Sequence, residues 1–109
     1  MPDMHAVLER QLAALAAGDI EAVMENYAPD AALVRFDGVF AGTERIRATL
    51  SAYLTLKPQL VELLHHAEHM DTVFYRAVMN VGGQQKDSMG MLVLRDGKIW
   101  RQAAVFLDV

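Results

Sequence analysis

The sequence predicts an α+β fold with helices in the first half of the chain and an antiparallel sheet in the second. Apolar residues recur at helical spacing as far as Leu54, whereas residues 59–107 suit strands. The pairs Gly82-Gly83 and Asp96-Gly97 interrupt that region, as expected for hairpin turns. Helices followed by a run of strands are typical of an α+β domain, and 109 residues suffice for one domain over residues 1–109.

The first helix is expected from about Asp3 to Ala17, because one apolar stripe runs along it and would face the sheet. The stripe consists of Met4, Val7, Leu8, Leu12 and Leu15. Gln11 lies on the same stripe. A polar side chain in that position lies either at the edge of the core or in a cavity.

A second helix is expected directly after the first. Gly18 can end the first helix and Asp19 can cap the second, which Pro29 ends. The apolar stripe of this helix is Ile20, Val23, Met24 and Tyr27. Residues Ala31–Phe36 then suit a strand, and Asp37-Gly38 is a turn signal.

Thr43 can cap a third helix, which Pro58 stops. Its apolar stripe is Ile46, Leu50, Tyr53 and Leu54. Four antiparallel strands are expected after it, at Gln59–Met70, Thr72–Val81, Gln84–Leu94 and Lys98–Leu107.

The turns between these strands set their register. A two-residue turn at Gly82-Gly83 places Tyr75, Ala77 and Met79 on one face with Lys86, Ser88 and Gly90. A three-residue loop at Arg95-Asp96-Gly97 would align Ser88, Gly90 and Leu92 with Trp100, Gln102 and Ala104 on that same face.

Residues 18–50, which read GDIEAVMENYAPDAALVRFDGVFAGTERIRATL, resemble the nuclear transport factor 2-like superfamily, and within it the SnoaL-like polyketide cyclases and ketosteroid isomerases. The matching positions are Gly18, Asp19, Ile20, Ala22, Tyr27, Ala28, Asp30, Ala31, Gly42 and Ile46. Residues 92–102, LVLRDGKIWRQ, are similar to the last hairpin of that family. The resemblance implies a cone-shaped, curved, mixed or antiparallel sheet wrapped around a pocket, with three helices on its concave face.

The same resemblance makes the face that carries Tyr75 the concave one. The expected pocket residues are Gln11, Tyr27, Tyr53, Tyr75, Ser88, Gly90, Trp100, Gln102 and Phe106. The opposite face would carry Phe74, Val78, Met89, Met91, Val93, Ile99, Ala103 and Val105, which are too apolar to leave in water. We therefore expect a homodimer through the convex sheet face, on which Arg76, Asp87 and Arg101 would form cross-strand ion pairs.

Composition excludes several classes of protein. A net charge of −4 and ten scattered basic residues argue against a nucleic-acid-binding protein. The N-terminus has neither a basic flank nor a continuous apolar run, so a soluble, cytoplasmic protein without a membrane partner is expected. The chain has no cysteine, which rules out disulfides and thiolate chemistry, and no motif implies a cofactor.

The chemistry of the resembled enzymes requires carboxylates that this chain lacks. Arg35 stands where a ketosteroid isomerase has its base, Gln11 where it has its helix-one tyrosine, and Gly90 where it has its strand carboxylic acid. An epoxide hydrolase needs Arg-x-Asp on a middle strand, and here Arg76-Ala77-Val78 keeps only the arginine, with Ala104 near the position of the later acid. Asp37 could reach the rim of the pocket, but its position before a glycine at the end of a strand favours a role in the turn.

His65, His66 and His69 are the remaining concentration of ionisable groups. They lack the spacing of a zinc site, so no metal is expected. A tight turn at Met70-Asp71 would place His66 opposite Tyr75 on the concave face, where the two could act as general acid and base. Inside the pocket Arg35 would attract a carboxylate, enolate or phenolate, whereas at a strand edge it would be solvated.

Two functions are compatible with this sequence. The first is binding of a small hydrophobic ligand, with isomerase- or cyclase-type proton transfer on an enolisable carbonyl by His66 and Tyr75 and with Arg35 or Gln102 stabilising the oxyanion. The second is a non-catalytic binding protein or dimerisation module.

Overall fold

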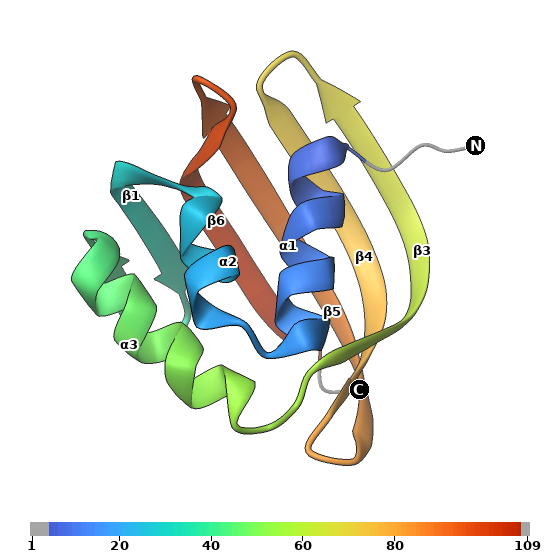
Figure 1. The fold of residues 1–109 in the computed structure, drawn as a ribbon. Helices are drawn as coiled ribbons and strands as arrows, with labels where there is room; N and C mark the ends of the chain where they lie inside the picture. The colour runs from blue at the N-terminus through green and yellow to red at the C-terminus, as the bar shows by residue number, and fades with distance from the viewer. Residues whose placement is uncertain (1–4, 108–109) are drawn as a thin grey trace.

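The computed structural model describes residues 5–107, which form three helices and one six-stranded sheet (Figure 1). The helices are α1 (Ala6–Ala17), α2 (Ile20–Glu25) and α3 (Thr43–Leu54). The strands are β1 (Tyr27–Arg35), β2 (Gly38–Ala41), β3 (Gln59–His69), β4 (Thr72–Val81), β5 (Gln84–Arg95) and β6 (Lys98–Leu107). No helix in the described part of the chain is long and apolar enough to cross a membrane.

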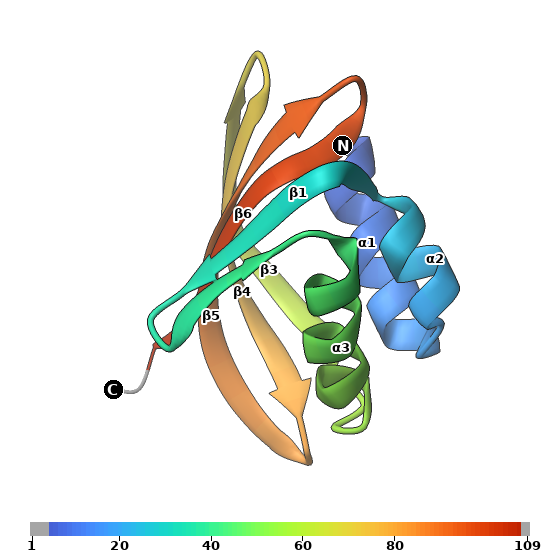
Figure 2. The same cartoon turned by 90° about the vertical axis from the view of Figure 1, so that its left-hand side faces the viewer.

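The sheet is curved, and the three helices lie on its concave side (Figure 2). Its strand order is β2-β1-β6-β5-β4-β3, with neighbouring strands antiparallel except for the parallel pair β1 and β6. The predicted fold class, a mixed curved sheet with helices from the first half of the chain on one face, is therefore confirmed.

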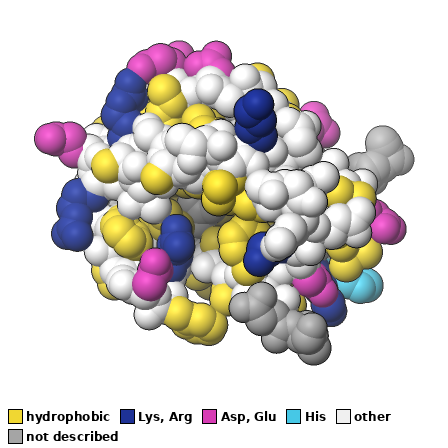
Figure 3. All heavy atoms as spheres, turned by 90° about the horizontal axis from the view of Figure 1, so that it is seen from below, with side chains coloured by type: hydrophobic (Ala, Val, Ile, Leu, Met, Phe, Trp, Pro, Cys, Tyr) yellow, Lys and Arg dark blue, Asp and Glu magenta, His cyan; other side chains and the backbone are white. Residues whose placement is uncertain are grey.

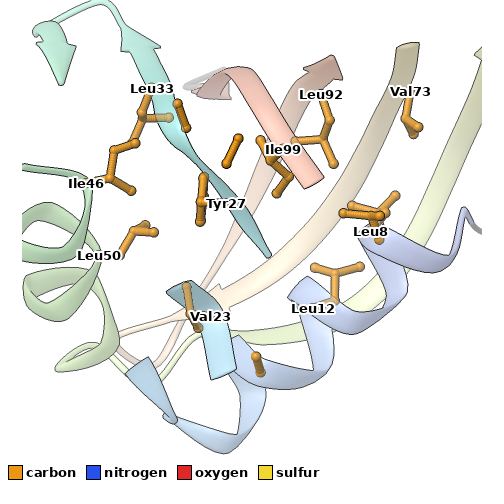
Figure 4. Close-up of a cluster of buried hydrophobic side chains, with 14 of the residues drawn as sticks. Leu8, Leu12, Val23, Tyr27, Leu33, Ile46, Leu50, Val73, Leu92 and Ile99 are labelled. Atoms are coloured by element: carbon orange, nitrogen blue, oxygen red, sulfur yellow. The ribbon is translucent and has the colours of Figure 1, made fainter. Parts of the chain in front are cut away.

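The core fills the space between the helices and the sheet (Figure 4). The helices contribute the predicted stripes, except for Met4, which lies outside the described residues, and Tyr27, which lies on β1. The strands contribute apolar residues from the concave face. The buried side chains include Val7, Leu8, Leu12, Val23, Ile46 and Leu50 from the helices and Leu33, Val73, Leu92 and Ile99 from the strands. Burial of these side chains is the main favourable term in folding.

The helix boundaries follow local signals for the most part. Gly18 is left-handed (φ 68°), and Asp19 caps α2 by accepting from the backbone N–H of Ala22 at 3.2 Å. Helix α1 begins at Ala6, and the expected start at Asp3 lies outside the described residues. The predicted cap at Thr43 is wrong, because Gly42 occupies the cap position and no side chain bonds there.

Tyr27 was expected on the second helix but begins strand β1. Helix α2 ends at Glu25, and the next carbonyl, that of Asn26, accepts a hydrogen bond from Ile99 N–H at 2.7 Å. The chain therefore leaves the helix and pairs with β6 from Tyr27, before it reaches Pro29. The short strand β2 was not predicted, because its four residues form a strand only through pairing with β1.

The predicted turn at Gly82-Gly83 is confirmed, with both glycines at positive φ and Tyr75 opposite Gly90. The predicted three-residue loop before Lys98 is wrong. Arg95 pairs with Lys98 across a two-residue turn, and a register shift follows between Val93 and Leu94. The shorter turn and the register shift each displace β6 by one residue relative to β5. Because the total is two residues, the even-numbered positions of β6 keep the expected face, with Gln102 opposite Leu92.

The bulge changes the surroundings of two neighbouring side chains. Ile99, expected on the outer face, is fully buried. Trp100, expected in the pocket, donates from Nε1 to Asp30 Oδ2 at 3.2 Å instead. The guanidinium carbons of Arg95 and Arg101 each lie 3.8 Å from the centre of its ring, which holds the indole outside the cavity.

Because the bulge places Ile99 in the core, Ile99→Ala is expected to lower the free energy of unfolding by about 2–5 kcal/mol. Val61→Ala, on exposed β3, is expected to cost less than about 1 kcal/mol. Urea unfolding followed by circular dichroism measures both. Equal losses in the two variants would contradict the inward orientation of Ile99.

Candidate functional site

A cavity of about 270 Å³ lies between the concave face of the sheet and helices α1 and α3. The face in Figure 3 is hollowed at its centre, with hydrophobic side chains around the hollow. The helices line the cavity with Gln11, Leu12, Leu15, Leu50 and Tyr53. The strands and the turn after β1 add Leu33, Arg35, Phe36, Asp37, Tyr75, Met79, Ser88, Met89, Gln102, Ala104, Val105 and Phe106. Met89 and Val105 were expected on the opposite face of the sheet alone, but both also border the cavity. Most of this wall is apolar.

A chain of hydrogen bonds forms the polar part of the wall. Asn26 Nδ2 donates to Gln11 Oε1 at 2.8 Å, and Gln11 Nε2 donates to the Tyr27 hydroxyl at 3.0 Å. The Tyr27 hydroxyl in turn donates to Gln102 Oε1. Gln11, Asn26 and Tyr27 are buried, so each bond satisfies a group that would otherwise be costly to remove from water.

Tyr75 depends on the glycine opposite it. A Cβ atom at Gly90 would lie 2.5 Å from the Tyr75 hydroxyl oxygen and 2.6 Å from Cζ. The ring therefore extends from β4 across the neighbouring strand β5, over the one position that has no side chain. This arrangement leaves Gly90 beneath the ring and brings the Tyr75 side chain to the cavity wall.

Burial keeps the three tyrosines neutral to a higher pH than free tyrosine. It raises the pKa of Tyr75 to about 12 and, assisted by the neighbouring Tyr75, that of Tyr53 to about 12. Burial raises the pKa of Tyr27 still further, with Tyr75 again contributing and the bond from Gln11 opposing. The phenols can therefore donate hydrogen bonds at neutral pH.

An ion pair lies at the edge of the cavity. Arg35 Nε is 3.1 Å from Asp37 Oδ1, and both side chains are substantially exposed. The rings of Tyr53 and Phe106, which also line the cavity, are tilted with centroids 6.2 Å apart. Because Arg35 also lowers the pKa of Tyr53, although less than burial raises it, the guanidinium lies within electrostatic range of that phenol. Arg35 is thus neither buried nor freely solvated.

The structure brings most of the sequence-predicted site residues together. Those that line the cavity are Gln11, Arg35, Tyr53, Tyr75, Ser88, Gln102 and Phe106. Ser88 donates to the Ala77 carbonyl at 2.9 Å, so its hydroxyl proton is already used. Tyr27 takes part through its bonds to Gln11 and Gln102, whereas Trp100 lies elsewhere.

His66 does not reach the cavity, although it pairs with Tyr75 in the predicted register. Its side chain is 20% exposed, and Nε2 lies 3.7 Å from Glu68 Oε2. The Tyr75 hydroxyl lies over β5, on the side of β4 away from His66, so the structure does not assemble the two into an acid–base couple. Within residues 5–107, no three His, Cys, Asp or Glu side chains form a group that could hold a metal ion.

Sequence reasoning missed Asn26 and underrated Asp37. Asn26 follows the last residue of α2, and nothing local indicates that its amide reaches Gln11, 15 positions earlier. Asp37 was assigned to the turn, where it does lie, but its side chain also borders the cavity. Leu12 and Leu15 were recognisable, since they share an apolar stripe with Gln11.

The sequence comparisons identify one family. The model of the SnoaL-like domain matches residues 8–102. A search of curated proteins gave no match.

Solved structures match the whole fold at low sequence identity. A nuclear transport factor 2-like protein from Cytophaga hutchinsonii has a TM-score of 0.79 and 17% identity, over 98% of this chain and 95% of that one. A Sinorhizobium meliloti protein named as a proposed polyketide cyclase has a TM-score of 0.82 and 21% identity, over 94% and 96%. A Catenulispora acidiphila protein with a ketosteroid isomerase-like fold, in complex with trimethylamine, has a TM-score of 0.81 and 16% identity, over 94% and 86%. At these identities the likeness concerns the fold alone.

Absorbance at 295 nm, which reports phenolate, tests the burial of the three tyrosines. We expect little phenolate at pH 10.5 in the folded protein and ordinary titration near pH 10 in denaturant. Because the unfolded chain loses these protons first, the stability they contribute is present below about pH 10 and is lost as the pH rises toward about 12. Half-titration near pH 10 under native conditions would contradict burial.

Proposed function

Because this chain belongs to the SnoaL-like family, we propose that it binds a small, mostly hydrophobic ligand in the cavity between the sheet and the helices. The observation that carries the proposal is a cavity of about 270 Å³ with an apolar wall and one polar side. Concave, mostly apolar sites with a few fixed polar groups are typical of ligand pockets.

The size of the cavity favours a ligand with two fused rings. An engineered apolar cavity of about 150 Å³ holds benzene, so a volume of about 270 Å³ suits a molecule nearer naphthalene in size. The name of the Sinorhizobium meliloti neighbour supports including aromatic, polyketide-like compounds in a ligand search.

A thermal-shift assay with bicyclic ketones, phenols and epoxides tests this proposal. A ligand at 100 times its Kd adds about 2.7 kcal/mol, which corresponds to a rise of about ten degrees in Tm for a domain of this size. Ala104→Leu adds three carbons to the cavity wall and is expected to weaken binding at least tenfold, roughly the loss expected when a snug pocket is overfilled.

Ala52→Leu provides the matched control, because it makes the same change at an exposed position of α3. Its ligand-induced shift is expected to equal that of the wild type. Equal binding by both leucine variants, or no shift with any bicyclic compound, would overturn the proposal.

Proton transfer on a bound enolisable ketone is the second candidate function. Asp37 favours it, because a carboxylate that borders the cavity can act as a base, and Arg35 beside it can stabilise an enolate oxygen. His66, outside the cavity, lends it no support. Exchange of the ketone's α-protons in D2O, faster with the protein than with its Asp37→Asn variant, distinguishes catalysis from binding alone.

We also propose that two copies of the chain associate through the outer sheet face. On this convex side Phe74 pairs with Met91, and Met91 pairs with Ala103. Phe74 is 46% exposed and Met91 39%, so both would gain from a covering partner. Arg76 Nη2 lies 2.5 Å from Asp87 Oδ2 and lowers the pKa of Asp87, so these two form the predicted ion pair. Arg101, also expected in such a pair, donates to the backbone carbonyls of Asp30 and Trp100.

Light scattering coupled to size exclusion measures the assembly. At micromolar concentration we expect twice the chain mass of 12.1 kDa for the wild type and the single-chain mass for Phe74→Glu, since a carboxylate would be buried there without a partner. Val61→Glu, at an exposed position of β3, should retain the dimer. A monomeric wild type would rule out the dimer.

A further inference from the structure

In the chain of hydrogen bonds from Asn26 to Gln102, the contact between Arg10 and Asn26 determines which partner donates in every bond. Arg10 Nε lies 3.5 Å from Asn26 Oδ1. A guanidinium can only donate, so the Asn26 oxygen faces Arg10 and its amide nitrogen faces inward. Asn26 Nδ2 then donates to Gln11 Oε1, which leaves Gln11 Nε2 to donate to Tyr27.

The same direction continues to the cavity. The Tyr27 oxygen accepts from Gln11, so its proton is donated to Gln102 Oε1. That bond occupies the Gln102 oxygen and leaves its Nε2 amino group as the free end of the chain. Within residues 5–107, Gln102 Nε2 makes no hydrogen bond, and Gln102 lines the cavity.

A second donor lines the same cavity. The Tyr75 hydroxyl makes no hydrogen bond to another residue within the described range, and its ring lies over Gly90 of β5. Gly90 pairs with Ala104 of β6, two residues from Gln102 and on the same face. A tyrosine hydroxyl is protonated at neutral pH, and burial raises the pKa of this one further, so it can donate to a ligand.

We propose that Gln102 Nε2 and the Tyr75 hydroxyl form a binding site for a neutral acceptor oxygen, so that the cavity selects bicyclic ketones, and that Asn26 sets this preference by orienting the chain. This inference rests on the proposed ligand binding and adds the chemical class of the ligand. Asn26 and Arg10 act as positioning residues. An uncharged carbonyl fits, because the site offers donors but, among the described residues, no buried cation to balance an anion.

Three bicyclic compounds of similar size probe the site: 1-indanone has an acceptor oxygen, indole has an N–H donor, and indane has neither. Tyr75→Phe removes one donor while keeping the ring. We expect it to lower the affinity for 1-indanone about fivefold relative to indane, the value of one neutral hydrogen bond. The carbonyl stretch of bound 1-indanone should also move to higher frequency in this variant.

Asn26→Asp tests the role of the chain's direction. A carboxylate only accepts, so Gln11 would turn its amide nitrogen toward Asp at position 26, and each later bond would reverse. Gln102 would then present Oε1 to the cavity, and Arg10 would pair with the new carboxylate. We expect the ratio of indole to 1-indanone affinity to rise at least tenfold, roughly one acceptor bond gained and one donor bond lost.

The outcomes separate the two proposals. If the wild type binds indane but Tyr75→Phe leaves the 1-indanone-to-indane ratio unchanged, the donor site is wrong and ligand binding stands. If Asn26→Asp folds, as judged by its Tm, and the indole ratio does not rise, the positioning role of Asn26 is overturned. If none of the three compounds binds the wild type, the proposed function fails for ligands of this size, and the inference fails with it.

Discussion

The buried chain of hydrogen bonds from Asn26 to Gln102 is the constraint on which the arrangement of helix and sheet depends. It joins α1, the start of β1 and β6, three elements that are distant in sequence. Apolar contacts alone are non-directional and would tolerate small rotations of α1. A rotation that moved Gln11 away from Tyr27 would leave several buried polar groups unpaired, so the polar chain selects one orientation of the helix.

The cavity follows from small residues on the concave wall. Gly90 and Ala104 pair with each other across β5 and β6, so the sheet presents little side-chain volume at its centre. The Tyr75 ring lies over Gly90 and occupies only part of this space. A protonated phenol therefore lies above Gly90, so the concave wall presents a hydrogen-bond donor at this point.

Local chemistry explains why much of the fold was predictable. The Gly18–Asp19 boundary, the Gly82-Gly83 turn and the bounds of β4 and β6 all follow from residues adjacent in sequence. The concave positions Gln102 and Phe106 were assigned to the right face for a different reason. The error in turn length and the unforeseen bulge shifted the register in the same direction, by two residues in total, which preserves the face of a strand. Ile99 and Trp100 lie at the bulge itself, and the positions predicted for them were wrong.

The sequence by itself determined the family, the fold class and part of the cavity wall, including Gln11, Tyr75 and Gln102, because stripes, caps and turns act over a few residues. Only the tertiary structure decided that Tyr27 is a strand residue, that Asn26 contacts Gln11, and that His66 lies apart from the cavity while Asp37 borders it. Each of these depends on pairing between distant segments. Strand pairing with β6 outweighed the helical pattern at Tyr27, and the space above Gly90 directed Tyr75 away from His66. The pattern of residues along the sequence contains no information on either effect.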